Sequence, residues 1–576
     1  MKSSKSKRPA AGRATSAVIA APPTHPSYFW PLIIGSFIAL CAVFTVYGPG
    51  LNGPFLLDDD YLPYTLPGFS TLPVTAWIRG NRPLLMLSYW LNFQMSGANT
   101  PSYHFFNVAL HLLNGVWIYL AVRKILDWAG TVGSTRGLMA AFAAGLFLLH
   151  PLQTESVTYI ASRSETLSVF FFLGAFVTFL YSLPIASLAR TAGVLLLFGA
   201  AVLTKEHTVV LPVLLLLTDY YWNPGFSFAG VRRNAKLYIT IAAVGALGGL
   251  FILRVLRSAT TAGFHVAGIT WYQYFFTECR VIWKYILLFV FPFWLNLDPD
   301  IAISRSLLDH GAVFGMLGLL GVSVAVWLYR REFPVASYGW FVFLLLLAPT
   351  SSFVPIADPY AERRLYLPFI GLLLITVEFV RRWKASRNVL IGALCGVLVF
   401  EAYITYNRNG LYSSAIAIWQ ETASKSPNKR RPNYQYAFAL FAAGRCPEAV
   451  QKFAYTATLE SPSYDLLLDW GLAASCAGDR ELALTKLRGA AALAPNAHVL
   501  STLGLEYLKQ GKYSEALDTL NTAIRIDSRL AIAYLYRGKV YELQGDTATA
   551  VKDYQRAVEL DPTNPEAAAA LQQVAH

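Results

Sequence analysis

The first 406 residues contain about eleven apolar runs, and these runs constrain the chain more than any other feature. A helix needs about 20 apolar residues to cross roughly 30 Å of hydrocarbon. Over the whole sequence 55% of residues are hydrophobic and only 14% are charged, unlike the composition of a soluble domain. We therefore predict an all-α, polytopic transmembrane domain over residues 28–406. Its candidate spans are 29–49, 103–122, 138–150, 165–183, 189–204, 208–222, 237–253, 311–329, 334–350, 365–381 and 388–406.

The positive charges predict how these spans are oriented. The net charge is +13, but Lys and Arg gather in short clusters between apolar runs and in residues 1–27, which we expect to be a disordered cytoplasmic tail. This pattern is typical of a topological signal, so nucleic-acid binding is excluded. A further apolar stretch, 272–295, carries three charged residues and is predicted to be re-entrant or interfacial. The number of crossings is then odd, which places everything after residue 406 outside the cytoplasm.

The C-terminal part repeats with a period of 33 to 34 residues, which is typical of tetratricopeptide repeats. Four copies are expected within residues 430–576, after a half-repeat connector at 407–429. Such repeats stack into an α-solenoid that binds proteins. Cys446 and Cys476 fall in adjacent repeats, and whether they pair stays open. The five cysteines have no metal-ligand spacing, so they predict no metal site.

The long first outer loop, about 50–102, carries the strongest candidate for chemistry. It contains three adjacent carboxylates just after the first span, at Asp58, Asp59 and Asp60. Neighbouring like charges raise a carboxyl pKa, which suits a general base or a cation site, although a solvated turn would have the same sequence. In the second span His104 and His111 lie on one helical face, either as a functional stripe or as interhelical hydrogen-bonding groups.

Several short motifs resemble one family in order and spacing. They are Phe55 to Asp59, Arg82-Pro83-Leu84, Tyr103-His104 with Asn107 and His111, His150 to Val157 with Arg163 and Glu165, and Ala361-Glu362-Arg363 with Leu365 to Pro368. Together with the repeat type, they resemble the TMTC proteins, the transmembrane and tetratricopeptide-repeat-containing O-mannosyltransferases. The short array and compact loops are similar to those of a bacterial member.

The resemblance implies a GT-C glycosyltransferase that moves a sugar, expected to be mannose, from a polyprenyl-phosphate carrier to Ser or Thr hydroxyls of exported proteins. Its partners would be that donor, membrane lipid and a protein acceptor held by the repeats. The expected location is the bacterial inner membrane, with a cytoplasmic N-terminus. Asp58 and Asp59 match the family's acidic pair and are the predicted catalytic residues. No cofactor is firmly implied, although a divalent cation could bind at Asp58 and Asp59. The residues expected to bind the donor phosphate or substrate are Arg82, His104, His111, His150, Glu155, Arg163, Glu362 and Arg363.

Two other functions are alternatives to an inverting transferase. A non-catalytic membrane anchor could display the solenoid, but it would need one span and no acids and bases gathered at one surface. A transporter would place ionisable groups near the membrane midplane. Here these groups crowd the outer face, which favours catalysis.

Overall fold

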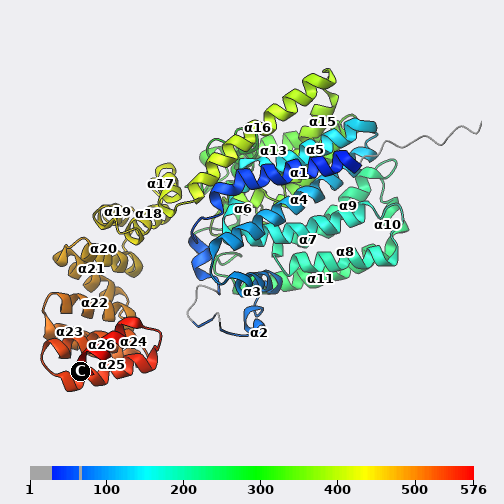
Figure 1. Ribbon diagram of the computed structural model, residues 1–576. Helices are drawn as coiled ribbons and strands as arrows, with labels where there is room; N and C mark the ends of the chain where they lie inside the picture. Colours follow the sequence, from blue (N-terminus) through cyan, green and yellow to red (C-terminus); the bar gives the residue numbers. More distant parts are fainter. Residues whose placement is uncertain (1–28, 64–67, 70, 576) are drawn as a thin grey trace, which may run out of the picture.

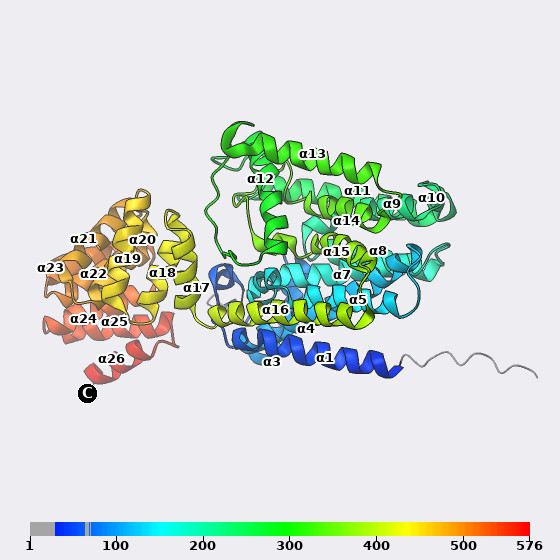
Figure 2. The same ribbon diagram turned by 90° about the horizontal axis from the view of Figure 1, so that it is seen from above.

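The computed structural model describes residues 29–63, 68–69 and 71–575, and within these ranges every regular element is a helix. The predicted basic tail at 1–27 lies outside the described residues. A bundle of long helices forms one half of the molecule and a curved array of short helix pairs forms the other (Figure 1). Both the first and the last helix of the bundle end on the side of the array (Figure 2). The predicted all-α architecture is confirmed.

Each predicted apolar segment contains a helix. The helices of the bundle, α12 included, are α1 (Phe29–Tyr47), α4 (Thr100–Trp128), α5 (Gly133–Leu149), α7 (Arg163–Leu180), α8 (Leu188–Val202), α9 (Leu211–Trp222), α11 (Ala235–Ser258), α12 (Trp271–Val290), α13 (Ala312–Leu328), α14 (Pro334–Leu347), α15 (Phe369–Arg382) and α16 (Arg387–Tyr412). Six stretches of the described chain are long and apolar enough to cross a membrane, and a seventh results if α5 and α6 (Thr154–Thr158), which meet at 52°, form one span. Helix length therefore accounts for six or seven of the eleven predicted crossings. Helices such as α8 and α14 are apolar but shorter.

Helix α12 runs across the direction of the long helices at the end of the bundle next to the array (Figure 2). Its charged side chains have partners in neighbouring loops. Arg280 donates to the carbonyl of Ala302 and the hydroxyl of Ser304, both at 3.0 Å, and the Lys284 ammonium lies over the ring of Tyr360. This placement agrees with the prediction that residues 272–295 do not cross the membrane beside the other helices. Its relation to the membrane stays a prediction.

Shorter elements connect the bundle helices. They are η1 (Gly48–Gly50), η2 (Leu57–Tyr61), α2 (Val74–Trp77), α3 (Pro83–Ser96), η3 (Pro151–Gln153), α6, η4 (Ile160–Ser162), η5 (Glu206–Val210), α10 (Ala229–Arg233), η6 (Asp309–Gly311) and η7 (Glu362–Leu365). Several of them, including η1, η3 and η7, lie at the end of the bundle that meets the array, where polar side chains replace apolar packing. There Asn409 of α16 donates to the carbonyl of Val46 at the end of α1, at 3.1 Å. Hydrogen bonds of this kind hold the loops that carry the candidate site.

The four predicted repeats appear as four helix pairs that begin at Arg430, Tyr464, Ala497 and Ala531. The pairs are α18 (Arg430–Ala442) with α19 (Cys446–Leu459), α20 (Tyr464–Cys476) with α21 (Arg480–Leu493), α22 (Ala497–Lys509) with α23 (Tyr513–Ile526), and α24 (Ala531–Leu543) with α25 (Thr547–Leu560), followed by α26 (Pro565–Ala575). The turn in each pair holds a glycine with positive φ, as at Gly511 (73°). A Cβ at Gly504 would lie 2.6 Å from Leu520, so that a side chain there would separate the pair.

The array is packed onto the bundle. In the connector, α17 (Ala415–Lys425) contributes Ile418 and Trp419 to one hydrophobic cluster with Leu56 and Tyr159 of the bundle and Leu440 of the first repeat. Ion pairs surround this cluster. The buried Asp298 carboxylate pairs with Lys429 at 2.6 Å and also with Arg431. The first repeat is therefore continuous with one end of the helix bundle.

Candidate active site

Asp58 and Asp59 lie in the same 3₁₀ turn but have different environments. Asp58 is exposed, and its backbone N–H donates to the Tyr159 hydroxyl at 2.9 Å. Asp59 is buried, and its carboxylate accepts from the backbone N–H groups of Leu56 (2.9 Å) and Ala161 (2.7 Å). Leu57, just before the pair, has φ +48°, an uncommon conformation for a leucine. Asp59 thus shapes the turn, and Asp58 is the carboxylate that faces outward.

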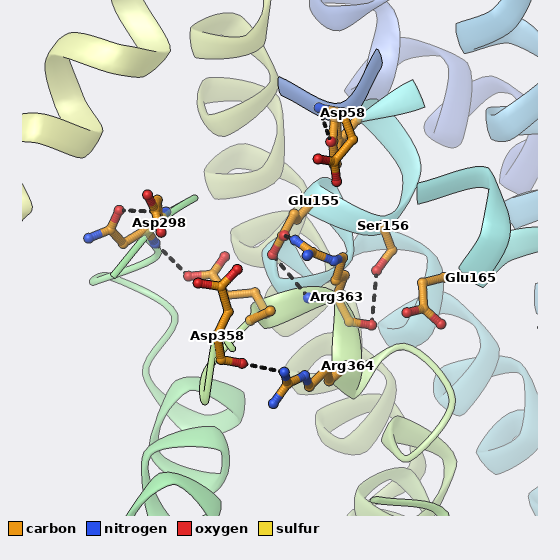
Figure 3. A network of polar contacts seen from close by, with 12 residues as sticks. Asp58, Glu155, Ser156, Glu165, Asp298, Asp358, Arg363 and Arg364 are labelled. Atoms are coloured by element: carbon orange, nitrogen blue, oxygen red, sulfur yellow. Dashed lines mark hydrogen bonds and ion pairs between the residues drawn. The ribbon is translucent and has the colours of Figure 1, made fainter. Parts of the chain in front are cut away.

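Glu155 and Arg363 form an ion pair close to Asp58 (Figure 3). The Glu155 carboxylate is fully buried in α6 and also accepts from the backbone N–H of Arg363 at 3.0 Å. The Arg363 side chain remains 28% exposed. Burial acts to lower the pKa of Arg363, but the charges of Glu155 and, to a smaller extent, Asp58 raise it above its ordinary value. A cation held in one orientation and open to solvent beside a carboxylate can bind a phosphate.

A second polar cluster joins the first outer loop to the loop before α9. Arg82 donates from Nε and from a terminal nitrogen to the Glu206 carboxylate, at 2.9 and 2.8 Å. Lys205 pairs with Glu165, and His207 lies 3.6 Å from the same carboxylate. Burial raises the pKa of Glu206, but Arg82 outweighs this effect and lowers it. The Arg82 side chain is 40% exposed, but its guanidinium is already paired with Glu206.

The histidines predicted to contact substrate are buried in structural positions. His111 Nε2 donates to the Leu148 carbonyl (3.1 Å), and Nδ1 shares a hydrogen bond with the Tyr366 hydroxyl (2.9 Å). His104 lies beneath the outer loop, 3.2 Å from the Gly53 carbonyl. The ring of His150 accepts from Leu152 N–H and approaches the Phe289 carbonyl at 3.0 Å. All three are at most 3% exposed, so they fix the positions of helices and loops around the site.

Arg163 and Glu362 are likewise buried. Arg163 donates to Asn107 (2.9 Å) and Asn92 (2.8 Å), and its guanidinium stacks over Tyr89. Glu362 accepts from the backbone N–H of Asn296, and its second carboxylate oxygen has no hydrogen-bond partner among the described residues. Of the eight predicted substrate-binding residues, the structure thus brings Glu155 and Arg363 next to the acidic turn. Arg82 lies in the second cluster, and the other five contribute to the surrounding framework.

Sequence reasoning assigned no role to several residues that complete the site. Tyr159 receives the hydrogen bond from Asp58 N–H, and Lys205 pairs with Glu165. Arg408 of α16 pairs with Glu421 of α17 at 2.6 Å. Two polar residues that are distant in sequence and meet only in the folded protein leave no periodic pattern in the sequence. The Lys205-Glu206-His207 run between two apolar segments was the one available indication.

Within the described ranges no group of three or more His, Cys, Asp or Glu side chains is arranged to hold a metal ion. The divalent cation considered at Asp58 and Asp59 stays a prediction. Such an ion would have to share the Asp59 oxygens with the two backbone N–H groups that donate to them.

The repeat assignment agrees with known families. Family models described as TPR repeat and as tetratricopeptide repeat match residues 504–545 and 531–564. The crystal structure of the MamA protein matches 26% of this chain and 81% of that chain, at 23% identity and a TM-score of 0.24.

Curated relatives match across both halves of the chain. Protein O-mannosyl-transferase TMTC3 of Mus musculus is 24% identical over 548 residues, covering 84% of this chain and 57% of the relative. Protein O-mannosyl-transferase TMTC1 of Homo sapiens is 24% identical over 486 residues, covering 71% and 53%. This chain is a homologue of the TMTC proteins. It spans little more than half the length of these relatives. Its long apolar helices and its repeats make it an integral membrane protein with tetratricopeptide repeats.

Proposed function

We propose that this TMTC homologue is a glycosyltransferase that moves a sugar, mannose by analogy with its relatives, from a polyprenyl-phosphate carrier to Ser or Thr hydroxyls of proteins. The observation that carries this proposal is the exposed Asp58 carboxylate beside the Glu155–Arg363 ion pair. A carboxylate and a guanidinium group thus lie near each other, which supports the roles of base and anion-binding cation proposed for them (Figure 3). The relatives' names supply the reaction class.

The proposed mechanism is a single displacement with inversion. Asp58 removes the proton of the acceptor hydroxyl as its oxygen attacks the anomeric carbon, and the bond from that carbon to the phosphate oxygen breaks. The phosphate leaves on the lipid with the electron pair, and Arg363 stabilises its growing charge. Glu155 keeps the guanidinium oriented. Because phosphate is already a good leaving group, a strong general acid is not required.

For the same function, the site and the repeats must lie where exported proteins pass. We propose a bacterial inner-membrane protein with a cytoplasmic N-terminus and an extracytoplasmic repeat array. The basic clusters between apolar segments support this orientation. A disulfide between Cys446 and Cys476 supports it as well, because such bonds persist in oxidising compartments.

The decisive experiment measures transfer from polyprenyl-phosphate mannose to a Thr-containing peptide by purified variants of equal folding. We expect Asp58→Asn to lower the rate about 10²- to 10⁴-fold without loss of stability, because it removes a base whose carboxylate forms no hydrogen bond or ion pair with the residues that the structure describes. Asp59→Asn should instead reduce the free energy of unfolding by about 1–3 kcal/mol, because one backbone N–H loses its buried acceptor.

Asp300→Asn is the matched control, because Asp300 is another exposed acid in a loop at the same end of the molecule. It should change neither rate nor stability. Near-normal transfer by Asp58→Asn would eliminate Asp58 as the base. An absence of any mannose transfer by the wild type, with other sugar donors active, would contradict the choice of sugar only.

A further inference from the structure

A groove of about 410 Å³ lies between the acidic loop and the start of the repeat array. One wall is the backbone and side chains of Pro54–Leu57, which lead directly into Asp58. The other wall comes from α17 and the first repeat helix α18, with Ile416, Phe438 and Ala442 among its residues. This volume is within the range of ligand-binding pockets. Figures 1 and 2 show α17 and α18 at the end of the bundle, where this wall stands.

The lining is mainly apolar, with a few polar groups suited to a peptide. Phe55, Ile416 and Phe438 contribute aromatic and aliphatic surface, and Phe438 is 39% exposed. Gln435 lines the same groove and carries an amide that can both donate to and accept from a peptide backbone. Such a surface favours an apolar side chain of a polypeptide over a sugar, which would need more polar partners.

The two walls are held in a fixed relation. Leu56 of the acidic loop shares a hydrophobic cluster with Trp419 and Leu440. Arg431, at the start of α18, pairs with Asp298 and with Asp358, the latter at 2.9 Å. The groove is thus present before any ligand binds, so that a ligand does not have to order it.

The position of the groove favours the polypeptide acceptor over the lipid donor as its ligand. The lipid donor must approach from the membrane, where its chain is soluble. The groove instead has one wall built from the first repeat. The repeats lack the long apolar runs of the membrane helices. Leu57 lines it, and Asp58 is the next residue along the chain. Asp58 itself is outside the lining, so a polypeptide with one side chain in the groove would present the hydroxyl of a neighbouring residue to Asp58.

We propose that this groove binds the acceptor polypeptide in an extended conformation and selects an apolar or aromatic side chain next to the modified Ser or Thr. The proposal rests on the transferase function given above. An extended chain advances about 3.3–3.6 Å per residue. The selected side chain is therefore within about two residues of the attacked hydroxyl. The first repeat acts as a wall of the site and determines sequence preference.

The first test maps binding without requiring catalysis. A twelve-residue Thr peptide with benzoylphenylalanine beside the Thr is photo-crosslinked to the full-length protein in detergent, and the adducts are located by mass spectrometry. We expect adducts within residues 54–57 and 414–443, and competition by an unlabelled Leu-Thr peptide at least about 10-fold stronger than by its Asn-Thr counterpart. Adducts confined to the later repeats, or equal competition, would overturn the proposal.

The second test fills the groove. Ala442 is exposed and lines it, so Ala442→Trp should block the apolar site without disturbing the fold. Ala548→Trp places the same side chain at an exposed position of α25 and serves as the control. We expect Ala442→Trp to raise the peptide KM about 10-fold or more and Ala548→Trp to leave it at the wild-type value.

The two tests separate this inference from the proposed function. If the wild type transfers no sugar but crosslinks within the groove with the expected preference, the transferase proposal fails and the peptide site stands. If transfer is normal and Ala442→Trp leaves the peptide KM at the wild-type value, the peptide site fails and the transferase stands.

Discussion

Adjacent charged residues in this chain differ in what surrounds them. Asp58 and Asp59 are neighbours, but only Asp59 has its carboxylate committed to backbone N–H groups. Glu362 and Arg363 differ in the same way, because Glu362 is buried and Arg363 is partly open to solvent. Burial raises the pKa of Glu362 to about 8, although Arg408 acts against this rise. Charge at these positions is therefore determined by the local environment.

The raised pKa of Glu362 predicts how stability depends on pH. A carboxyl whose folded-state pKa exceeds its unfolded value of about 4.3 contributes stability that is fully present below pH 4.3. This contribution is lost as pH rises through about 8. We expect the thermal midpoint of the wild type to fall over this range relative to Glu362→Gln. The exposed Glu515→Gln should follow the wild type, and parallel curves for all three proteins would contradict the prediction.

At the scale of elements, the repeat helices have two kinds of connection. Each pair packs closely across a small residue, as Gly471 does against Leu487, where a Cβ would lie 2.7 Å away. The first two pairs are also linked covalently, because Cys446 at the start of α19 is bonded to Cys476 at the end of α20. This bond stabilises the two repeats that adjoin the membrane domain.

The disulfide gives a prediction for location and stability together. In the native membrane, Cys446 and Cys476 should resist maleimide labelling until they are reduced, because an extracytoplasmic pair is oxidised. Replacing both with Ser should reduce the free energy of unfolding of the array by about 2–4 kcal/mol. Labelling of Cys446 or Cys476 in the untreated wild type would argue for a cytoplasmic array. Cys41→Ser is the control and should leave the array unchanged.

At the scale of the whole molecule, the bundle and the array share a boundary that carries the candidate site. Tyr159 and Leu56 of the bundle and Leu440 of the first repeat belong to one hydrophobic cluster. The Arg408–Glu421 and Asp298–Lys429 ion pairs lie along the same boundary. The array is thus packed against the end of the bundle that carries the candidate site, and its first repeat and the connector before it make these contacts.

Truncations test whether the site depends on this packing. Ending the chain after residue 429 removes Leu440 and Arg431, so the acidic loop loses packing and Asp298 loses a partner. We expect this protein to lose transfer to all acceptors and donor hydrolysis alike. Ending it after residue 495 keeps the first two repeats, and it should retain hydrolysis while large protein acceptors react poorly. Equal rates of donor hydrolysis in the two truncated proteins would show that the array and the site are independent.

Much of the architecture could be predicted because it depends on local periodicity. Apolar runs identified every helix of the bundle, and the 34-residue repeat identified all four pairs, including glycines such as Gly511 at their turns. Each of these signals lies within one element. The apolar residues that a helix buries on one face follow a regular spacing in its own sequence. The family motifs also named Asp58, Glu155 and Arg363, but only among ten candidate residues.

Only the tertiary structure decided which of these ten candidates meet solvent. His111 and Arg163 match their motifs as well as Arg363 does, but they are enclosed by other elements and hydrogen-bonded within the core. The groove beside Asp58 likewise arises between segments more than 350 residues apart. Exposure and ion pairing depend on which distant segments pack together. A sequence motif states which groups are present, and only packing determines which of them meets solvent.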